Sequence, residues 1–238
     1  MTNNPYPIKS KQNEKSDTKI SVRINKYLAL KNISTRRGAD ELIEKKQVFI
    51  NGKLAKLGDK VNEKDNVEVK GNKEKKYKYL AYNKPIGLMT EDISKNALFP
   101  IGRLDKNSHG LIILTNDGRI TDKLLNPKYV HEKEYIVKTS NKLRSNFKQK
   151  MEAGVNIEGY LTKKCKVKII DNFTFKIILT EGKKHQIRRM CSALFQEIAD
   201  LKRVRIMNIN LGNLKPNNSR EIMGKELTIF LDQVLHQS

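Results

Sequence analysis

A short apolar run between two polar turns constrains the fold of this chain more than any other stretch. Within residues 102–118, the run Leu-Ile-Ile-Leu at 111–114 is typical of a buried β-strand. The Asn-Asp-Gly at 116–118 predicts a turn directly after it. Asp105 lies on the polar loop before the strand, where a carboxylate can be held rigidly and still be reached by a substrate. The alternative is that Asp105 only caps a turn.

Positive charge is spread along the whole chain. The 238 residues include 48 Lys and Arg against 26 Asp and Glu, a net charge of +22. Residues 1–77 hold 19 basic and 10 acidic residues, and residues 78–238 hold 29 and 16. This balance predicts a polyanionic partner, of which nucleic acid is the commonest. Only 11 of the basic residues are Arg, and several lie in the motifs below, which indicates a need for rigid guanidinium forks.

The composition also bears on membranes, metals and cofactors. No apolar run approaches the roughly 20 residues that span a bilayer, and the first 19 residues lack the apolar core of a secretory signal. The cysteines, Cys165 and Cys191, and the four histidines show no metal-ligand spacing. A Gly-rich dinucleotide loop is missing. We therefore expect a cytoplasmic protein that uses no metal, no cofactor and no membrane.

The distribution of apolar, polar and charged residues along the chain predicts four segments. Residues 1–19 read as a disordered basic arm, residues 20–71 as a small domain, residues 72–77 as a charged linker, and residues 78–238 as a larger domain.

Two helices and a hairpin are predicted for the small domain. Ile24, Tyr27 and Leu28 share one helix face. Ser34 is expected to cap the second helix, and Asn51-Gly52 predicts a tight hairpin turn.

The larger domain mixes helices and strands, which predicts an α+β fold. Helices are expected at about 119–125, 141–152 and 185–195, and a strand at about 174–179. A further strand is expected to point Arg203 and Arg205 outward, where they would contact phosphate.

Three motifs in the larger domain together resemble those of the RNA pseudouridine synthases. They are Lys-Pro-Ile-Gly at 84–87, Gly-Arg-Leu-Asp at 102–105 and Glu-Gly-Lys-Lys-His-Gln-Ile-Arg-Arg-Met at 181–190. Their order is the family's order, and the likeness is to the bacterial rRNA branch (RsuA, RluB, RluE and RluF). Residues 163–168 and 205–208 resemble the large-subunit synthase F type. Residues 48–52, Val-Phe-Ile-Asn-Gly, make the small domain resemble an S4 RNA-binding domain.

This resemblance implies an enzyme that isomerises a specific uridine of ribosomal RNA, preferably 23S, to pseudouridine without a cofactor. It implies an S4 domain followed by a catalytic domain with a mixed, mostly antiparallel sheet. The family's catalytic positions fall on Asp105, Tyr135 and Arg188. A carboxylate suits cleavage at an electron-poor sugar carbon, as in glycoside hydrolysis, and an Arg fork can orient it.

The remaining site expectations also follow from the resemblance. Substrate-binding positions are Arg103, Leu179, Lys84 and Arg189. RNA-binding positions in the small domain are Arg23, Lys26, Arg36 and Arg37. Arg103 would hold the flipped nucleotide through a phosphate.

Some residues depart from the family pattern, and others have an alternative assignment if the resemblance is set aside. His109 and the Lys184-His185 pair differ from the large-subunit members, which leaves the target uridine open. Without the resemblance, Tyr135 would be assigned to the sheet and the small-domain arginines to a solvated helix face.

Two rival functions compete with isomerisation. One is a non-catalytic RNA-binding ribosome-assembly factor on the same scaffold, against which the intact Asp, Tyr and Arg positions argue. The other is a uracil glycosylase that cleaves without rejoining. A monomer is expected.

Overall fold

The chain forms two compact units, Met1–Asn72 and Lys73–Ser238. In this computed structural model the described residues are 21–235, apart from 32, 63, 72–75 and 94–97. The arm expected at 1–19 and most of the linker expected at 72–77 lie outside them. Among the helices in the described part of the chain, none is long and apolar enough to cross a membrane.

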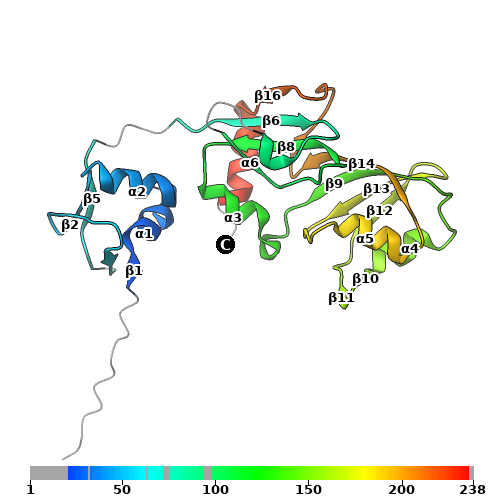
Figure 1. The fold of residues 1–238 in the computed structure, drawn as a ribbon, viewed down its shortest axis with the longest axis horizontal. Helices are drawn as coiled ribbons and strands as arrows, with labels where there is room; N and C mark the ends of the chain where they lie inside the picture. Colours follow the sequence, from blue (N-terminus) through cyan, green and yellow to red (C-terminus); the bar gives the residue numbers. More distant parts are fainter. Residues whose placement is uncertain (1–20, 32, 63, 72–75, 94–97, 236–238) are drawn as a thin grey trace, which may run out of the picture. The chain divides into compact units, whose positions relative to one another are not determined.

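The first unit has two helices, with one short strand before them and further short strands after them (Figure 1). Its elements are β1 (Val22–Arg23), α1 (Ile24–Leu30), α2 (Arg36–Glu44), β2 (Val48–Ile50), β3 (Lys53–Leu54), β4 (Lys60–Val61) and β5 (Val67–Val69). As predicted, Ile24 and Leu28 are buried and Tyr27 packs beside them. Asn51 and Gly52 both have positive φ, +50° and +78°, which is the backbone that a two-residue hairpin turn requires.

Helix α2 begins one residue later than predicted. Thr35, not Ser34, is its N-cap, because the Thr35 hydroxyl accepts the Gly38 N–H at 3.0 Å. Ser34 is buried instead. Both residue types cap helices well, so composition alone does not choose between them.

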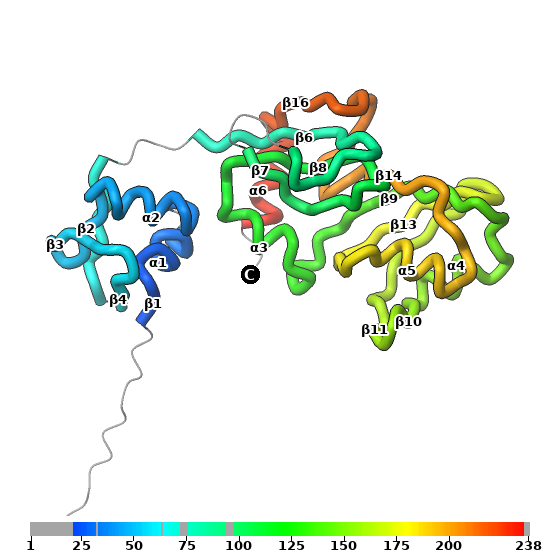
Figure 2. The backbone as a smooth tube through the Cα atoms, in the orientation of Figure 1, coloured from blue at the N-terminus to red at the C-terminus, as the bar shows by residue number. Residues whose placement is uncertain are grey.

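The second unit is built on one large sheet with helices and 3₁₀ turns, and Figure 2 traces the course of its backbone. Its elements are β6 (Tyr79–Lys84), η1 (Thr90–Asp92), β7 (Phe99–Ile101), β8 (His109–Thr115), α3 (Arg119–Leu125), η2 (Pro127–Tyr129), β9 (Lys133–Thr139), α4 (Phe147–Ala153), β10 (Asn156–Ile157), β11 (Tyr160–Leu161), β12 (Lys166–Ile169), β13 (Thr174–Leu179), α5 (Gln186–Ala193), β14 (Ile198–Ile206), β15 (Ile209–Asn210), β16 (Ser219–Glu221) and α6 (Gly224–Leu235).

The sheet confirms the expected mixed, mostly antiparallel arrangement. Its main path is β12-β13-β9-β14-β8-β6-β16, with β15 beside β14 and β7 beside β8. Among the described strand pairs, only β14 with β8 is parallel. Helices α4 and α5 lie at the β9–β13–β12 end of the sheet, and α3 and α6 lie at the β6–β8 end (Figure 1).

The central residues of β8, 111–114, are all apolar because both faces of the strand are covered. Leu111 and Ile113 pack into the cluster that includes α3 and α6 residues. Ile112 and Leu114 pack into a second cluster with Leu104. The unbroken apolar run at 111–114 is therefore that of a strand buried on both sides.

The predicted turn after β8 is held by a buried carboxylate. Asp117 accepts the Tyr79 hydroxyl at 2.5 Å and both the Nε and Nη2 of Arg119, at 2.7 and 2.8 Å. The Arg119 guanidinium also stacks on Tyr77, 4.1 Å from its ring centroid. Tyr77, expected to belong to the linker, is thus packed against the second unit.

The prediction for Arg203 is wrong. Its side chain is 1% exposed, and it donates to the carbonyl oxygens of Leu111 at 2.7 Å and Gly102 at 2.5 Å. Strand β14 lies between β9 and β8 and is irregular between Arg203 and Arg205. Arg205 is also satisfied internally, by Glu134 at 2.9 Å and Glu132 at 3.0 Å. Neither guanidinium is free for phosphate.

Candidate active site

A pocket of about 460 Å³ opens beside the loop between β7 and β8. This size is within the range of small-ligand sites. The loop before α5 and the strands β9 and β13 supply the rest of its wall. Five residues singled out in the sequence line it: Arg103, Asp105, Tyr135, Leu179 and Arg188.

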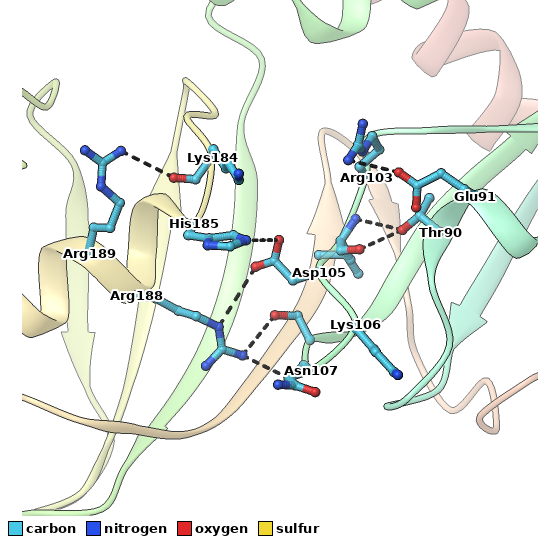
Figure 3. Close-up of polar contacts among 12 residues, drawn as sticks. Thr90, Glu91, Arg103, Asp105, Lys106, Asn107, Lys184, His185, Arg188 and Arg189 are labelled. Carbon is cyan, nitrogen blue, oxygen red and sulfur yellow. Dashed lines mark hydrogen bonds and ion pairs between the residues drawn. The ribbon is translucent and has the colours of Figure 1, made fainter.

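Asp105 faces two nitrogen-bearing side chains from the α5 region (Figure 3). The His185 Nε2 lies 3.1 Å from Asp105 Oδ1, and the Arg188 Nε lies 3.9 Å from Oδ2. The Asp105 side chain is 36% exposed, so the carboxylate is both held and accessible. An anchored but reachable carboxylate is what attack on, or proton removal from, a sugar demands.

Arg188 also fastens the loop that carries Asp105. Its Nη2 donates to the Asn107 carbonyl at 3.0 Å and to the Ser108 Oγ at 3.2 Å (Figure 3). The guanidinium therefore does not form a two-bond fork with the carboxylate. It positions the loop backbone and lies close to the Asp105 charge at the same time.

The loop before α5 places His185 by an unusual backbone conformation. His185 is the N-cap residue of α5 and has φ +53°, which is uncommon for a residue other than glycine. Buried Glu181 braces this loop by accepting Tyr160 Oη at 2.6 Å and Gln186 Nε2 at 2.8 Å. Although burial opposes ionisation of Glu181, these hydrogen bonds leave its pKa below the ordinary value.

Strands β9 and β13 supply the apolar and aromatic wall. Tyr135 pairs with Ile177, and Lys133 pairs with Leu179, so the pocket side chains alternate along both strands. Lys133 is buried, and burial together with neighbouring Arg203 lowers its pKa to about 8. At neutral pH it remains mostly protonated and adds positive charge to the pocket wall.

Arg103 lines the mouth of the pocket from an exposed position. Its Nη2 lies 2.9 Å from Glu91 Oε1, and the Arg103 side chain is largely in solvent (Figure 3). An ion pair this exposed contributes little stability, so a phosphate could replace Glu91 at small cost.

Lys84 does not line the pocket, contrary to its predicted role in substrate binding. It is 0% exposed, and its ammonium donates to the carbonyl oxygens of Pro85 at 3.0 Å and Leu88 at 2.6 Å. A third, longer bond goes to the Lys106 carbonyl, next to Asp105. Lys84 therefore fastens the 85–88 turn next to the loop that carries Asp105.

Arg189 is likewise turned away from the pocket. It donates to the Ile157 carbonyl at 3.1 Å and pairs with Glu158 at 2.8 Å. These partners belong to the β10–β11 hairpin region, so Arg189 joins α5 to that hairpin. Because successive helix residues point about 100° apart, Arg188 and Arg189 cannot both face Asp105.

The basic residues predicted for RNA binding in the first unit are exposed. Helix α1 carries Lys26, and Arg23 lies immediately before it. Helix α2 begins with Arg36 and Arg37. Within the described residues no ion pair occupies them. Their charges are therefore available to a polyanion.

His109 joins two strands and, among the described residues, does not belong to a metal site. The His109 Nε2 lies 2.9 Å from Asp200 Oδ1 and ties β8 to β14. No group of three or more His, Cys, Asp or Glu side chains in the described ranges is arranged to hold a metal ion.

His185 is the pocket residue whose place the sequence did not reveal. The Lys184-His185 pair stood out only as a departure from the family pattern. Its contact with Asp105 depends on the positive φ at residue 185 and on the fold of the 102–109 loop, neither of which has a local sequence signal.

An S4 fold followed by a sheet-based unit with a carboxylate pocket defines an RNA-modifying enzyme of a known class. The chain belongs to the RNA pseudouridylate synthase family, whose model matches residues 61–193, and it carries an S4 domain at residues 22–67. It is an RNA pseudouridine synthase of the S4-bearing branch.

Individual relatives are consistent with this branch. The chain is 42% identical over 224 residues to the dual-specificity RNA pseudouridine synthase RluF of Escherichia coli K12, covering 87% of this chain and 77% of that one. It is 32% identical over 228 residues to the ribosomal large subunit pseudouridine synthase B of Bacillus subtilis 168, covering 86% and 93%. A crystal structure of a pseudouridylate synthase shares the fold, with a TM-score of 0.66 and 24% identity over 90% of this chain and all of that one.

Proposed function

We propose that this enzyme converts one uridine of large-subunit (23S) ribosomal RNA to pseudouridine, with Asp105 as the group that acts on the ribose. The observation that carries the proposal is the Asp105 carboxylate in a pocket of nucleotide size, flanked by His185 and Arg188. The Bacillus subtilis relative, a ribosomal large subunit pseudouridine synthase, supports ribosomal RNA as the substrate class, and the Escherichia coli relative supports RNA.

The residues around the pocket suit each stage of the reaction. The C1′–N1 bond breaks, the uracil turns, C5 bonds to C1′, and the proton on C5 leaves. Asp105 serves the ribose carbon, while Tyr135 and Leu179 form a wall against which the uracil can turn. Tyr135 is assigned to assist removal of the C5 proton, and Arg103 to hold the phosphate of the flipped nucleotide.

We further propose that the enzyme works as a cytoplasmic monomer. The two cysteines, Cys165 and Cys191, are unpaired, which suits a reducing compartment.

The test is release of tritium from C5-labelled uridine in unmodified large-subunit rRNA, combined with mass spectrometry of the product. We expect release with no change in RNA mass. Free uracil and an abasic RNA would instead indicate a glycosylase. RNA binding without release, on large-subunit, small-subunit and transfer RNA alike, would favour a non-catalytic assembly factor.

The exposed arginines of α2 are expected to bind RNA phosphates. Reversing both charges, with Arg36→Glu and Arg37→Glu, should weaken binding of 23S RNA and reduce the slope of log K against log salt by about 0.7–0.9 for each phosphate that is no longer neutralised. Lys53→Glu with Lys56→Glu on the β3 segment makes the same change in net charge and is the control. Equal affinities and slopes in wild type and the α2 variant would assign Arg36 and Arg37 to ordinary solvated surface.

A further inference from the structure

Helix α5 ends in a left-handed residue that is a phenylalanine. The Gln196 N–H bonds to the Cys191 carbonyl and the Phe195 N–H to the Ser192 carbonyl, which is the Schellman pattern of a helix end. In this pattern the left-handed position is usually glycine. Here Phe195 occupies it with φ +60°, a conformation that is unfavourable for a bulky side chain.

The Phe195 ring gives nothing to the hydrophobic core in return. Phe195 is 70% exposed, more than the other exposed large hydrophobic residues in the described part of the chain. Both its backbone and its exposure are thus unfavourable for stability alone. The Arg144 guanidinium lies 4.8 Å from the ring centroid, so a π-surface and a positive charge are adjacent.

Neighbouring hydrogen bonds hold the backbone that carries the Phe195 ring. Asn141 Nδ2 donates to the Phe195 carbonyl at 3.1 Å, and Asn141 Oδ1 accepts the Glu197 N–H at 3.2 Å. The segment that carries Arg144 is therefore fastened to the end of α5. Because the backbone is already held, a ligand that stacks on the ring has only the side-chain rotations to restrict.

Phe195 borders a hollow that shares a residue with the catalytic pocket. The hollow is lined by Asn141, Arg188, Ser192, Phe195, Gln196, Glu197 and Ile198. Arg188 also lines the catalytic pocket and lies 3.9 Å from Asp105. A strand of RNA with its target uridine at Asp105 can therefore reach this hollow without leaving the same unit.

We propose that Phe195 and Arg144 form a binding site for an unpaired nucleotide of the RNA substrate, close in space to the target uridine. The base stacks on the Phe195 ring and its phosphate is neutralised by Arg144, the two features that proteins use to hold single-stranded nucleic acid. Glu197 repels phosphate and accepts from amino groups, so the base edge faces Glu197 and the backbone lies toward Arg144. The site rests on the proposed RNA substrate.

Substitutions at Phe195 distinguish the effect of the aromatic ring from the effect of an apolar side chain of similar size. Phe195→Leu keeps an apolar side chain but removes the ring, and we expect the Kd for the 23S RNA and the KM for tritium release to rise roughly 10-fold with kcat nearly unchanged. Phe195→Tyr keeps the ring and should restore both values. Leu161→Ala on β11 removes an equally exposed apolar side chain, at 66% exposure, and serves as the control.

A glycine at position 195 should weaken RNA binding without lowering the stability of the protein. Phe195→Gly places the favoured residue at the helix end, so the Tm should stay level or rise. RNA binding should weaken as in Phe195→Leu. A purely structural role for the ring predicts instead that Tm and affinity fall together.

Measuring RNA binding and tritium release separately distinguishes a failure of the nucleotide site from a failure of the proposed function. If wild type releases no tritium from large-subunit RNA, the proposed substrate is wrong, while Kd values for the same RNA still test the stacking site. If Phe195→Leu and Phe195→Gly bind RNA as wild type and the Leu161→Ala control do, the nucleotide site is overturned.

Discussion

Asp105→Asn is expected to abolish tritium release from C5-labelled RNA, lowering the rate by at least about 10³-fold. The affinity for RNA should change by less than about threefold, because the positive charges around the pocket remain. Asparagine has the same size as aspartate, so the loop should keep its shape. What disappears is the anion that acts on the ribose.

The surroundings of Asp105 sharpen this expectation. His185 at 3.1 Å and Arg188 at 3.9 Å are placed to face oxygens on both sides of the carboxylate. An amide has one oxygen and one NH₂ group, so it cannot present an acceptor oxygen to both side chains, and one of the two contacts made by the carboxylate is lost. Any residual activity should therefore not be rescued by raising the RNA concentration.

Asp122→Asn is the matched control, because it makes the same chemical change on α3, outside the lining of the pocket. It should leave tritium release unchanged. Wild-type rates from purified Asp105→Asn enzyme would show that another group acts on the ribose, and Asp105 would then be only a turn residue.

Gly110→Ala is expected to destabilise the second unit by about 3 kcal/mol or more. A Cβ at residue 110 would lie 2.2 Å from the Arg203 carbonyl oxygen and 2.8 Å from its nitrogen. Both are backbone atoms of the adjacent parallel strand β14, so they cannot swing aside. The positive φ of +104° adds strain for any side chain.

Thermal or urea unfolding of the intact chain measures this effect. Gly182→Ala is the control, since a Cβ there meets nothing within 4 Å and the backbone does not need a positive φ. The control should unfold near the wild-type midpoint. A Gly110→Ala protein as stable as wild type would mean that β8 and β14 can separate at little cost.

The sequence was sufficient to predict those helices and strands that depend on a local residue pattern. The helix expected at 119–125 and the strand expected at 174–179 begin and end where predicted. The apolar run 111–114 is a buried strand, and the α+β class with a mostly antiparallel sheet is confirmed. Hydrophobic periodicity and turn chemistry act over a few residues, so they can be read without a tertiary structure.

Helix ends were less accurate. The helix expected over 141–152 is Phe147–Ala153, and the one expected over 185–195 is Gln186–Ala193. Capping residues of similar propensity compete at each end, and tertiary contacts choose among them.

The motif residues show that a local sequence pattern does not by itself predict which side chains line the pocket. The motifs singled out Asp105, Tyr135, Leu179 and Arg188, and the fold brings these four to one pocket. Lys84 belongs to the same motifs, yet it is buried next to the loop that carries Asp105 and does not line the pocket.

By itself, the sequence determined the elements, the class of enzyme and the acidic residue at the centre of the pocket. Only the tertiary structure decided which charges face it. Arg203 was expected on the surface and is buried by strands on both sides, while His185 reaches Asp105 through a left-handed backbone. A side chain's partner is set by residues distant in the chain, and the spacing of residues along the chain carries no record of that proximity.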